Sequence, residues 1–239
     1  MKKILSCGLI AILGFSLIGC SSIKQVNVNS EDSDGNQSQN REELIISNEN
    51  MTIAIPIEQI PTIHTYLEDY PSNSSERKTE IDRMVVNPLP NPNATYAVIG
   101  YGCGIKLCNN VFVKYKNDQV TSIPLPESSF FQEALITVDN KYLAIKLGEN
   151  EGSTVSRSSL VIIDTVEFKN AELQNNSEII NKLINGNFTV PIHDLQWEND
   201  TTLKFTIPDI QDYSFETLEQ WNQEESESKT KEVKITVAK

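Results

Sequence analysis

The chain of 239 residues carries 33 acidic and 20 basic side chains, so its formal net charge is −13. A surface with this excess of negative charge repels phosphate backbones and anionic lipid headgroups, which argues against nucleic-acid binding and against electrostatic attraction to membranes. Hydrophobic residues make up 38% of the chain, which is enough for the core of one domain of ordinary size.

The N-terminal segment has the features of an export signal. Lys2 and Lys3 form a basic start, and residues 4–18 form a continuous apolar run. A helix that crosses a bilayer needs about 20 apolar residues, whereas this run is shorter and is followed at once by polar chain. The sequence therefore predicts a cleaved signal peptide over residues 1–19 rather than a membrane-spanning anchor. Its removal deletes two positive charges and changes the net charge from −13 to −15.

The four residues Leu17, Ile18, Gly19 and Cys20 resemble the lipobox of bacterial lipoproteins. This resemblance implies that lipid is transferred to the thiol of Cys20, that cleavage follows on its amino side, and that two or three acyl chains hold the mature protein on a membrane. More than one acyl chain gives stable anchoring. Ser21, in place of Asp, resembles lipoproteins sorted to the outer membrane. The expected location is the cell envelope, on the periplasmic side of the outer membrane, with the outer face of a Gram-positive cytoplasmic membrane as the alternative.

Export also changes how the other cysteines are interpreted. Once the signal peptide is removed and Cys20 is lipidated, Cys103 and Cys108 remain. An oxidising compartment allows two cysteines joined by a short loop to form a disulfide. A metal site is the alternative, but zinc prefers four ligands, and His64 and His193 lie far away in the sequence. We expect the disulfide, which favours a Gram-negative host because many exported Gram-positive proteins avoid cysteine.

The segment after the lipidation site is expected to be a disordered tether. Ser, Asn, Gln, Glu and Asp dominate residues 20–50, and such a composition cannot bury enough apolar surface to offset the entropy of ordering. The tether would hold the folded part away from the bilayer. Residues 51–239 are then expected to form a single, mainly β globular domain.

Two short helices are predicted within this domain. The first begins at Pro61 and reaches about residue 70, and the polar residues 72–78 are expected to end it. The second covers residues 176–186, because a capping residue lies at one end and Gly186 at the other.

A third segment of uncertain type surrounds Trp221. Phe215, Leu218 and Trp221 are spaced by three residues and are followed by the acidic run 224–227. This spacing is typical of an amphipathic helix that packs on a sheet and has a solvated acidic end. A recognition loop of aromatic and acidic residues is the alternative.

Short strands dominate the rest of the chain and fall into three units. Their period-two patterns and turn residues predict antiparallel hairpins separated by variable loops. The predicted strands are 84–86, 94–99, 111–115 and 120–125 in the first unit, 134–138, 141–147 and 160–164 in the second, and 192–197, 202–207 and 233–237 in the third.

Each unit contains one segment in which an Asp or Asn turn precedes a short strand: residues 93–98, 139–145 and 200–205. These segments resemble the inner hairpin of β-propeller blades of the TolB and WD40-like kind. The resemblance implies an incomplete or small propeller-like arrangement, because three units are visible and propellers typically have four to eight blades. We therefore expect a mainly β fold of short-stranded antiparallel sheets with two short helices. A β-sandwich with Greek-key connections is the alternative.

The third unit ends one strand short of the first. A sheet that stopped there would expose an edge of unpaired backbone groups. Residues 52–57 form a β-like run in which three isoleucines alternate with other residues. We expect this run to pair with residues 233–237 and so to join the two ends of the domain.

Most catalytic motifs are absent from the sequence, and one match, Ser-x-x-Lys at residues 21–24, lies on the predicted tether, where no scaffold could orient it. The sequence contains no Gly-x-Ser-x-Gly turn, no His-Glu-x-x-His motif, no phosphate-binding loop and no dinucleotide-binding turn. His193 and Asp194 are neighbours on a predicted strand, so their side chains should point to opposite faces rather than form a dyad. We expect no catalytic residue, no cofactor and no metal.

The predicted function is that of a non-enzymatic binding or structural module. Its expected partners are the membrane, through the covalent lipid alone, and an envelope protein or polymer, but no nucleic acid. A lipid-anchored hydrolase with Asp or Glu residues on its loops is the alternative.

Overall fold

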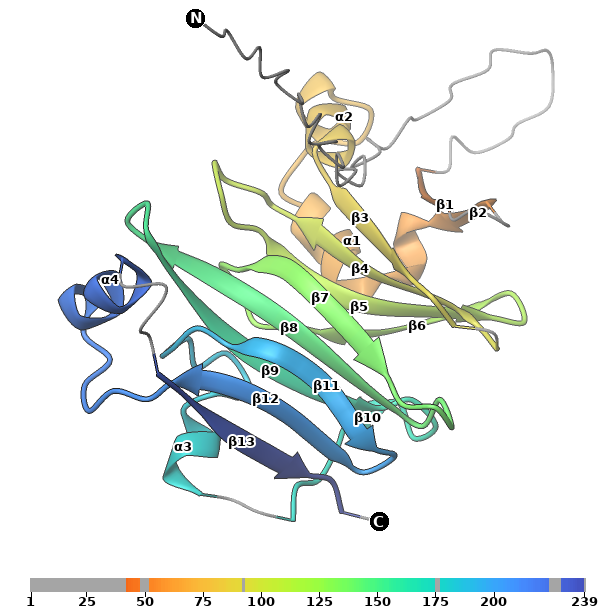
Figure 1. Ribbon diagram of the computed structural model, residues 1–239. Coiled ribbons are helices and arrows are strands. Elements are labelled where there is room, and N and C mark those ends of the chain that lie inside the picture. The colour runs from red at the N-terminus through yellow and green to blue at the C-terminus, as the bar shows by residue number, and fades with distance from the viewer. Residues whose placement is uncertain (1–41, 48–51, 92, 175–176, 224–228, 239) are drawn as a thin grey trace, which may run out of the picture.

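The structure of this protein is a computed structural model that describes residues 42–47, 52–91, 93–174, 177–223 and 229–238 (Figure 1). Within these ranges the fold is mainly β, as predicted, with four antiparallel sheets and four α-helices. No helix in these ranges is long and apolar enough to cross a membrane.

Three of the sheets are meanders, in which strands that follow one another in the chain pair as neighbours. They confirm the three predicted units. The first sheet contains β3 (Val85–Leu89), β4 (Thr95–Tyr101), β5 (Asn109–Lys116) and β6 (Gln119–Pro124); the second contains β7 (Phe130–Ile136), β8 (Tyr142–Glu151), β9 (Val155–Asp164) and β10 (Lys169–Asn170); the third contains β11 (His193–Asn199), β12 (Thr202–Pro208) and β13 (Thr230–Thr236).

The fourth sheet is an N-terminal hairpin of β1 (Glu43–Ser47) and β2 (Thr52–Pro56). A short 3-10 helix, η1 (Ile57–Gln59), follows it. The α-helices are α1 (Pro61–Leu67), α2 (Ser75–Asp82), α3 (Glu178–Asn181) and α4 (Phe215–Gln223).

The sheets stack face to face, and the central strand β4 shows why. All seven of its residues are buried. Ala97 and Ile99 pack with the N-terminal hairpin and α1, whereas Tyr96 and Val98 pack against the second sheet. Because alternate side chains point to opposite faces, a strand that is apolar on both faces must lie between two layers.

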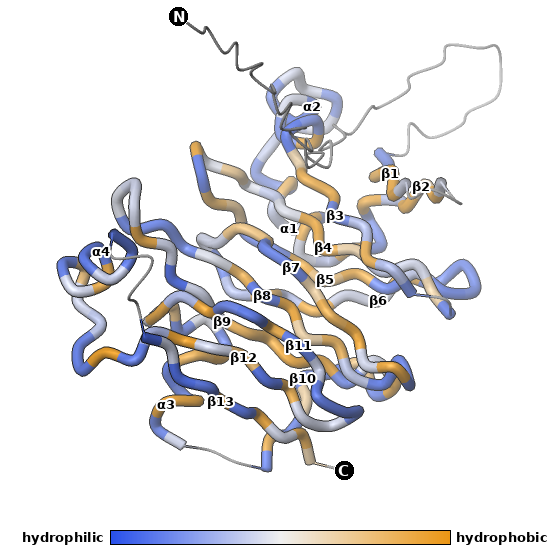
Figure 2. The backbone as a smooth tube through the Cα atoms, in the orientation of Figure 1, coloured by the Kyte–Doolittle hydropathy of each residue, from blue (hydrophilic) through white to orange (hydrophobic). Residues whose placement is uncertain are grey.

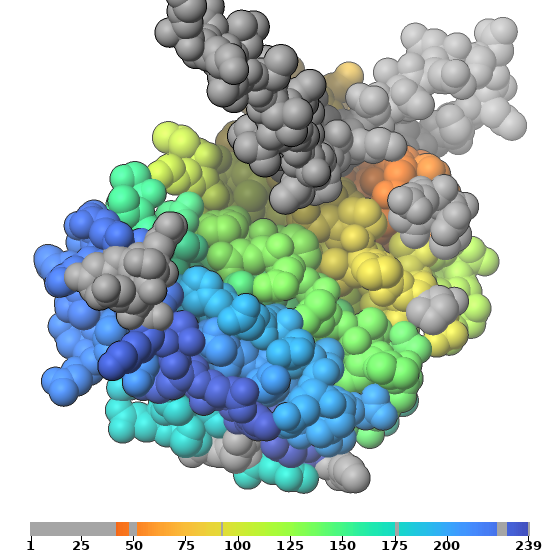
Figure 3. Space-filling model, in the orientation of Figure 1, coloured from red at the N-terminus to blue at the C-terminus, as the bar shows by residue number. Residues whose placement is uncertain are grey.

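The second sheet is covered on both faces in the same way. In β8, Leu143 and Ile145 face the first sheet, and Ala144 faces the third sheet, where it joins the cluster that contains Leu203 and Phe205. The order of layers is therefore N-terminal hairpin with helices, first sheet, second sheet and third sheet. Figure 3 shows this progression as successive colour bands across the molecule, and Figure 2 shows apolar residues concentrated on the strands.

The third sheet ends the stack, and its outer face is polar. The ammonium of Lys234 lies 2.7 Å from the Glu198 carboxylate, and that of Lys204 lies 3.8 Å from Glu232. These exposed ion pairs contribute little to stability, but they keep this face hydrated. No further layer is needed to cover it.

The predicted pairing of residues 52–57 with residues 233–237 is wrong. β2 pairs with β1, so that Ile55 lies opposite Leu44 and Ile53 opposite Ile46. The outer edge of β13 instead meets the segment after β10, where the Gln174 N–H donates to the Thr236 carbonyl at 2.8 Å. Local pairing prevails because a hairpin closes a loop of only a few residues, whereas pairing of the two termini would close most of the chain.

The predicted boundary of the tether at residue 50 is also wrong. Leu44 and Ile46 are fully buried in the core beside the first sheet. These two side chains alternate with more exposed ones and give the short strand β1 an apolar face. The rest of the predicted tether, residues 20–41 and 48–50, lies outside the described residues.

Helix α2 was not expected, because its sequence is almost entirely polar. Ser74 caps its N-terminus by accepting a hydrogen bond from the backbone N–H of Arg77 at 3.1 Å. Arg77 is nearly buried and donates through Nε and Nη2 to the Glu42 carboxylate at 2.8 Å. It also donates to the carbonyl of Leu67 at the end of α1. A charged side chain therefore joins the start of β1 to both helices, which an apolar pattern cannot reveal.

Leu44→Ala should destabilise the protein by about 2–5 kcal/mol, because it removes a fully buried side chain from the core. Denaturant unfolding followed by circular dichroism measures the change. Glu43→Ala, in the same strand, is the matched control and should change the free energy of unfolding by less than about 1 kcal/mol. Equal stability of the two variants would show that β1 does not belong to the folded core.

Candidate functional site

The strands give the molecule two ends that differ in their connections. We call one the turn end: it contains residues 93–94, 117–118, 137–141, 164–168 and 199–201, which connect strands by tight turns. The other is the loop end, which contains residues 102–108, 125–129, 152–154 and α4. Figure 1 shows the turns together at the lower right and the longer loops with α4 at the upper left.

Side-chain hydrogen bonds to the backbone fix four of the five turns at the turn end. Asn91, Asp164 and Asn199 each accept hydrogen bonds from the backbone N–H groups two and three residues further on, at 2.7 to 3.1 Å. Asp139 accepts from the Lys141 N–H at 3.0 Å and from the Thr137 hydroxyl at 2.6 Å. Such bonds fix the backbone of a turn. The turn end is therefore a preorganised surface.

Two large apolar side chains are exposed on neighbouring turns of this surface. Val138 is 94% exposed and Val166 is 68% exposed. Their turns are held together because Thr165 donates from its N–H to the Lys141 carbonyl at 2.9 Å and from its hydroxyl to the Asn140 carbonyl at 2.6 Å. Both valines are thus presented by a rigid, hydrogen-bonded double turn.

A shallow depression of about 470 Å³ lies beside this double turn, between the second and third sheets. It is lined by Asp139, Lys141, Tyr142, Asn199, Asp200 and Thr201. The Lys141 ammonium lies 4.9 Å from the centre of the Tyr142 ring, which is a cation–π contact. The depression therefore offers a positive charge, carboxylates and an amide group, whereas the Tyr142 side chain is buried in the core.

The surroundings of Asp139, which lines this depression, shift the pKa of its carboxyl. Partial burial alone would raise the pKa of its carboxyl, but the hydrogen bonds from the Thr137 hydroxyl and the Lys141 N–H outweigh this and lower the pKa. Asp139 is consequently ionised at neutral pH, so it can accept a hydrogen bond or form an ion pair with a cationic group. A carboxylate in this state does not donate a proton as a general acid.

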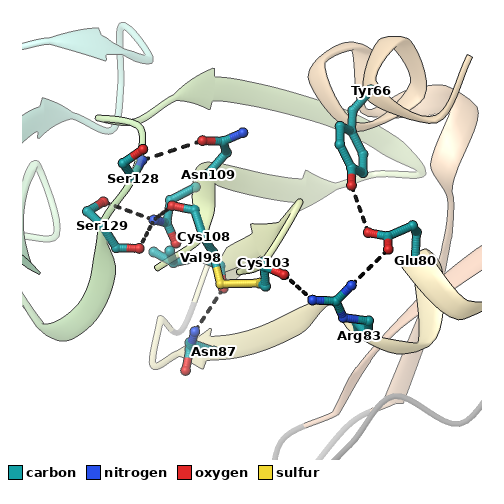
Figure 4. The surroundings of a disulfide bond; sticks show 11 residues. Tyr66, Glu80, Arg83, Asn87, Val98, Cys103, Cys108, Asn109, Ser128 and Ser129 are labelled. Carbon is teal, nitrogen blue, oxygen red and sulfur yellow. Dashed lines mark hydrogen bonds and ion pairs between the residues drawn. A yellow bond between two sulfur atoms is a disulfide. The ribbon is translucent and has the colours of Figure 1, made fainter. Parts of the chain in front are cut away.

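At the loop end, the sulfur atoms of Cys103 and Cys108 lie 2.08 Å apart, at disulfide distance, which agrees with the predicted pairing (Figure 4). Backbone hydrogen bonds hold the second cysteine, because Cys108 and Ser129 exchange N–H to carbonyl bonds of 2.9 and 3.0 Å. The Asn110 amide also donates to the Ser129 carbonyl at 3.0 Å. Two sulfurs bonded to each other cannot ligate zinc, and no group of three metal-binding side chains occurs in the described part of the chain.

Side chains from the helices hold the first cysteine. The Tyr66 hydroxyl donates to the Glu80 carboxylate at 2.7 Å, and the same carboxylate accepts from Arg83 at 2.9 Å (Figure 4). Arg83 also donates to the Cys103 carbonyl. Burial raises the pKa of Tyr66 far above its ordinary value, and the hydrogen bonds to Tyr70 and Glu80 act in the same direction. Tyr66 therefore stays protonated and remains a donor at physiological pH.

The two histidines lie on different elements and contact different side chains. His64 lies on α1, where its Nδ1 is 3.7 Å from the carboxylate of Glu68. The ring of His193 packs beside that of Trp221, with 5.6 Å between the ring centres. Its neighbour Asp194 instead accepts a hydrogen bond from the Thr206 hydroxyl at 2.7 Å. His193 and Asp194 thus do not form a dyad.

The pKa of His193 is shifted by its surroundings. Desolvation of the ring lowers this pKa, and the nearby Lys146 ammonium lowers it further, although Asp194 acts in the opposite direction. His193 is therefore neutral at physiological pH and packs as an aromatic ring beside Trp221.

The segment around Trp221 forms the amphipathic helix α4 and not an extended loop. Leu218 is fully buried, and the Thr154 hydroxyl donates to Glu219 at 2.9 Å, so that α4 is attached to the hairpin between β8 and β9. The acidic run 224–227 and the predicted lipidation site Cys20 lie outside the described residues.

Sequence reasoning missed the exposed apolar residues Val138, Val166 and Ile105. Each has a polar residue or a glycine on both sides in the sequence. An apolar residue between turn-forming residues has no strand face on which to be buried, and this was the signal that could have identified all three.

Replacing both Cys103 and Cys108 by Ser should lower stability by only about 2 kcal/mol and leave the fold intact, because a six-residue loop removes little entropy from the unfolded chain. The contacts of Arg83 and Ser129 with this loop should persist. Thermal unfolding and near-ultraviolet circular dichroism test this. Free thiols in protein purified from its host without reductant would contradict the pairing itself.

No known protein family, no curated protein and no solved structure matches this chain significantly.

Proposed function

We propose that this protein is a lipid-anchored lipoprotein of the bacterial cell envelope that binds another envelope protein through its turn end. The anchor is proposed from Leu17, Ile18, Gly19 and Cys20, which resemble a lipobox and follow a basic and apolar leader. The periplasmic side of the outer membrane is the favoured location, because Ser21 follows the cysteine and a cysteine pair suits an oxidising compartment. Binding, rather than catalysis, is the proposed activity.

The exposure of Val138 and Val166 on one rigid double turn carries this proposal. Exposed apolar side chains gain free energy when a partner covers them, by about 25 cal/mol per Å² of apolar surface. Their turns are fixed by hydrogen bonds before any partner arrives, so little conformational entropy is lost on binding. Isolated apolar side chains are common on protein surfaces, but two on adjoining turns beside a depression form the centre of a contact surface.

The depression next to the double turn supplies polar specificity. Asp139 and Lys141 place opposite charges at its border. A protein partner can match such a pattern with its own charges around an apolar centre. A protein is favoured over an envelope polymer because the two exposed large hydrophobic side chains described at the turn end are aliphatic.

Cys20→Ser should abolish lipid attachment and leave an uncleaved precursor, because the cysteine thiol is the group that receives the lipid in proteins with a lipobox. Mass spectrometry of protein extracted into the detergent phase measures the acyl mass and the mature N-terminus. An unmodified Cys20 in the unaltered protein, or cleavage elsewhere, would contradict the proposed anchor.

A photo-crosslinking amino acid at Val138 should capture one discrete partner in intact cells. The same amino acid at Gln196, which is exposed on the third sheet, is the control and should capture none. Val166→Asp in the Val138 crosslinker background should reduce the captured product at least about tenfold, the effect of 1.4 kcal/mol, without changing the melting temperature.

Equal capture at positions 138 and 196, or an unchanged yield with Val166→Asp, would show that the turn end is not the binding surface. Capture of a glycan instead of a protein would reject the protein partner and support the polymer.

A further inference from the structure

The three meander sheets end at β3 and β6, at β7 and β10, and at β11 and β13, and most of these edges are protected. β3 contains Pro88, β10 is only two residues long, and β11 is interrupted by two register shifts. On β7 the Leu135 carbonyl accepts a hydrogen bond from the Trp197 indole at 3.0 Å. The segment after β10 covers the edge of β13, since the Gln174 N–H donates to the Thr236 carbonyl. Proline, short length, irregular register and covering chain all hinder pairing with a further strand.

β6 is the edge strand that lacks such protection over most of its length. It pairs with β5 on one side, and within the described ranges no backbone hydrogen bond reaches its other side. The Leu125 N–H donates to the Asn110 carbonyl at 2.9 Å, so Leu125 directs its backbone groups toward β5. Because this direction alternates along an antiparallel strand, the N–H and C=O groups of Val120 and Ser122 point away from β5. Pro124 has the same orientation but no N–H.

The side chains of β6 do not block the approach of a further strand. Residues 119–126 carry no charge, although the whole chain has a net charge of −13. Gln119 and Thr121 lie on the same face of the first sheet as Ile123, which packs toward the second sheet. Both are nevertheless exposed, so the second sheet does not cover this half of β6.

The outward groups of this edge match an extended polypeptide. Those of Val120 and Ser122 repeat after two residues, about 7 Å, which is the spacing that the backbone of another β-strand offers. The edge is also self-complementary. When two copies meet antiparallel around a two-fold axis at Thr121, Val120 of each copy lies opposite Ser122 of the other, and each such pair exchanges both of its hydrogen bonds. Every outward N–H of this short edge is then bonded.

We propose that β6 pairs antiparallel with β6 of a second copy of this chain, around a two-fold axis at Thr121. The two first sheets then form one continuous sheet. β6 begins at the turn end and antiparallel strands run in opposite directions, so the two turn ends of the dimer lie on opposite sides. The pairing goes beyond the proposed function and depends neither on the lipid anchor nor on Val138 and Val166.

The neighbours of Thr121 favour this register over those next to it. An axis at Ser122 would place Val120 opposite Pro124, which has no N–H to donate. An axis at Val120 would place Ser122 opposite Asp118, which lies in the tight turn with a φ of 59°. With the axis at Thr121, the two threonine side chains face each other as a non-hydrogen-bonded pair, and cross-strand Thr–Thr pairs are favourable.

Thr121→Cys tests the register directly. Opposing residues of a non-hydrogen-bonded pair have Cα atoms about 4.5 Å apart, which is within the range of a disulfide. Oxidation of the full chain with copper phenanthroline should therefore yield a covalent dimer on a non-reducing gel. Gln119→Cys, exposed on the same face of the same strand, is the matched control. Its two copies would lie about 14 Å apart, so it should yield about tenfold less dimer. The unaltered protein supplies the background from Cys7 and Cys20.

Sedimentation equilibrium measures the association without a crosslink. The unaltered protein, in a density-matched detergent, should show twice the mass of one chain at high concentration and dissociate on dilution. Thr121→Lys should lower the dimer fraction, because it places two ammonium groups opposite each other. Gln119→Lys adds the same charge opposite Ile123 and should lower it less. Ser122→Pro removes an outward N–H but no bond to β5, so it should also lower the dimer fraction without changing the melting temperature.

A monomer at every concentration, or equal crosslinking at positions 119 and 121, would overturn the proposal. Equal loss of dimer with Thr121→Lys and Gln119→Lys would reject the axis at Thr121. A disulfide from position 121 to a different protein in intact cells, in place of a second copy, would reject self-pairing and assign the edge to a foreign strand. None of these measurements involves the acyl mass or capture at Val138, so a failure here is distinct from a failure of the proposed function.

Discussion

The fold depends on burial of the first and second sheets on both faces. The strands β4 and β8 carry apolar side chains in both of their alternating sets, so neither sheet is stable with one face in water. The N-terminal hairpin with α1 and α2 covers one side of this pair, and the third sheet covers the other. The polar outer face of the third sheet then ends the stack.

With the faces occupied, new contacts are available mainly at the ends of the strands. The two ends differ in chemistry. At the turn end, acidic and amide side chains fix the turns, and Val138 and Val166 project from them. At the loop end, Cys103 and Cys108 and the Tyr66–Glu80–Arg83 network hold a loop tipped by Ile105. A stack of sheets thus separates the exposed valines of the turn end from the disulfide loop.

Local pattern accounts for the successful part of the sequence prediction. The three strand units, the cysteine pair and the helix at Phe215–Gln223 depend on side chains close together in sequence. The failures involve interactions that local pattern does not encode. β1 was assigned to the tether because Leu44 and Ile46 stand among polar residues, and α2 was missed because the buried group that secures it is the guanidinium of Arg77. The predicted pairing of residues 52–57 with residues 233–237 assumed that the edge of the last strand must be covered by another strand. In the structure the segment near Gln174 covers the edge of β13.

The sequence by itself determined that the chain is mainly β, where most strands lie, and that Cys103 and Cys108 are close enough to pair. These properties follow from period-two patterning, turn residues and short separation along the chain. Only the tertiary structure decided which sheets share a face, which strand pairs with β2, and that Ile105, Val138 and Val166 remain exposed. Exposure of a side chain depends on which other parts of the chain pack over it. The order of the layers depends on how all the apolar faces compete for burial, and no single segment of the sequence contains that information.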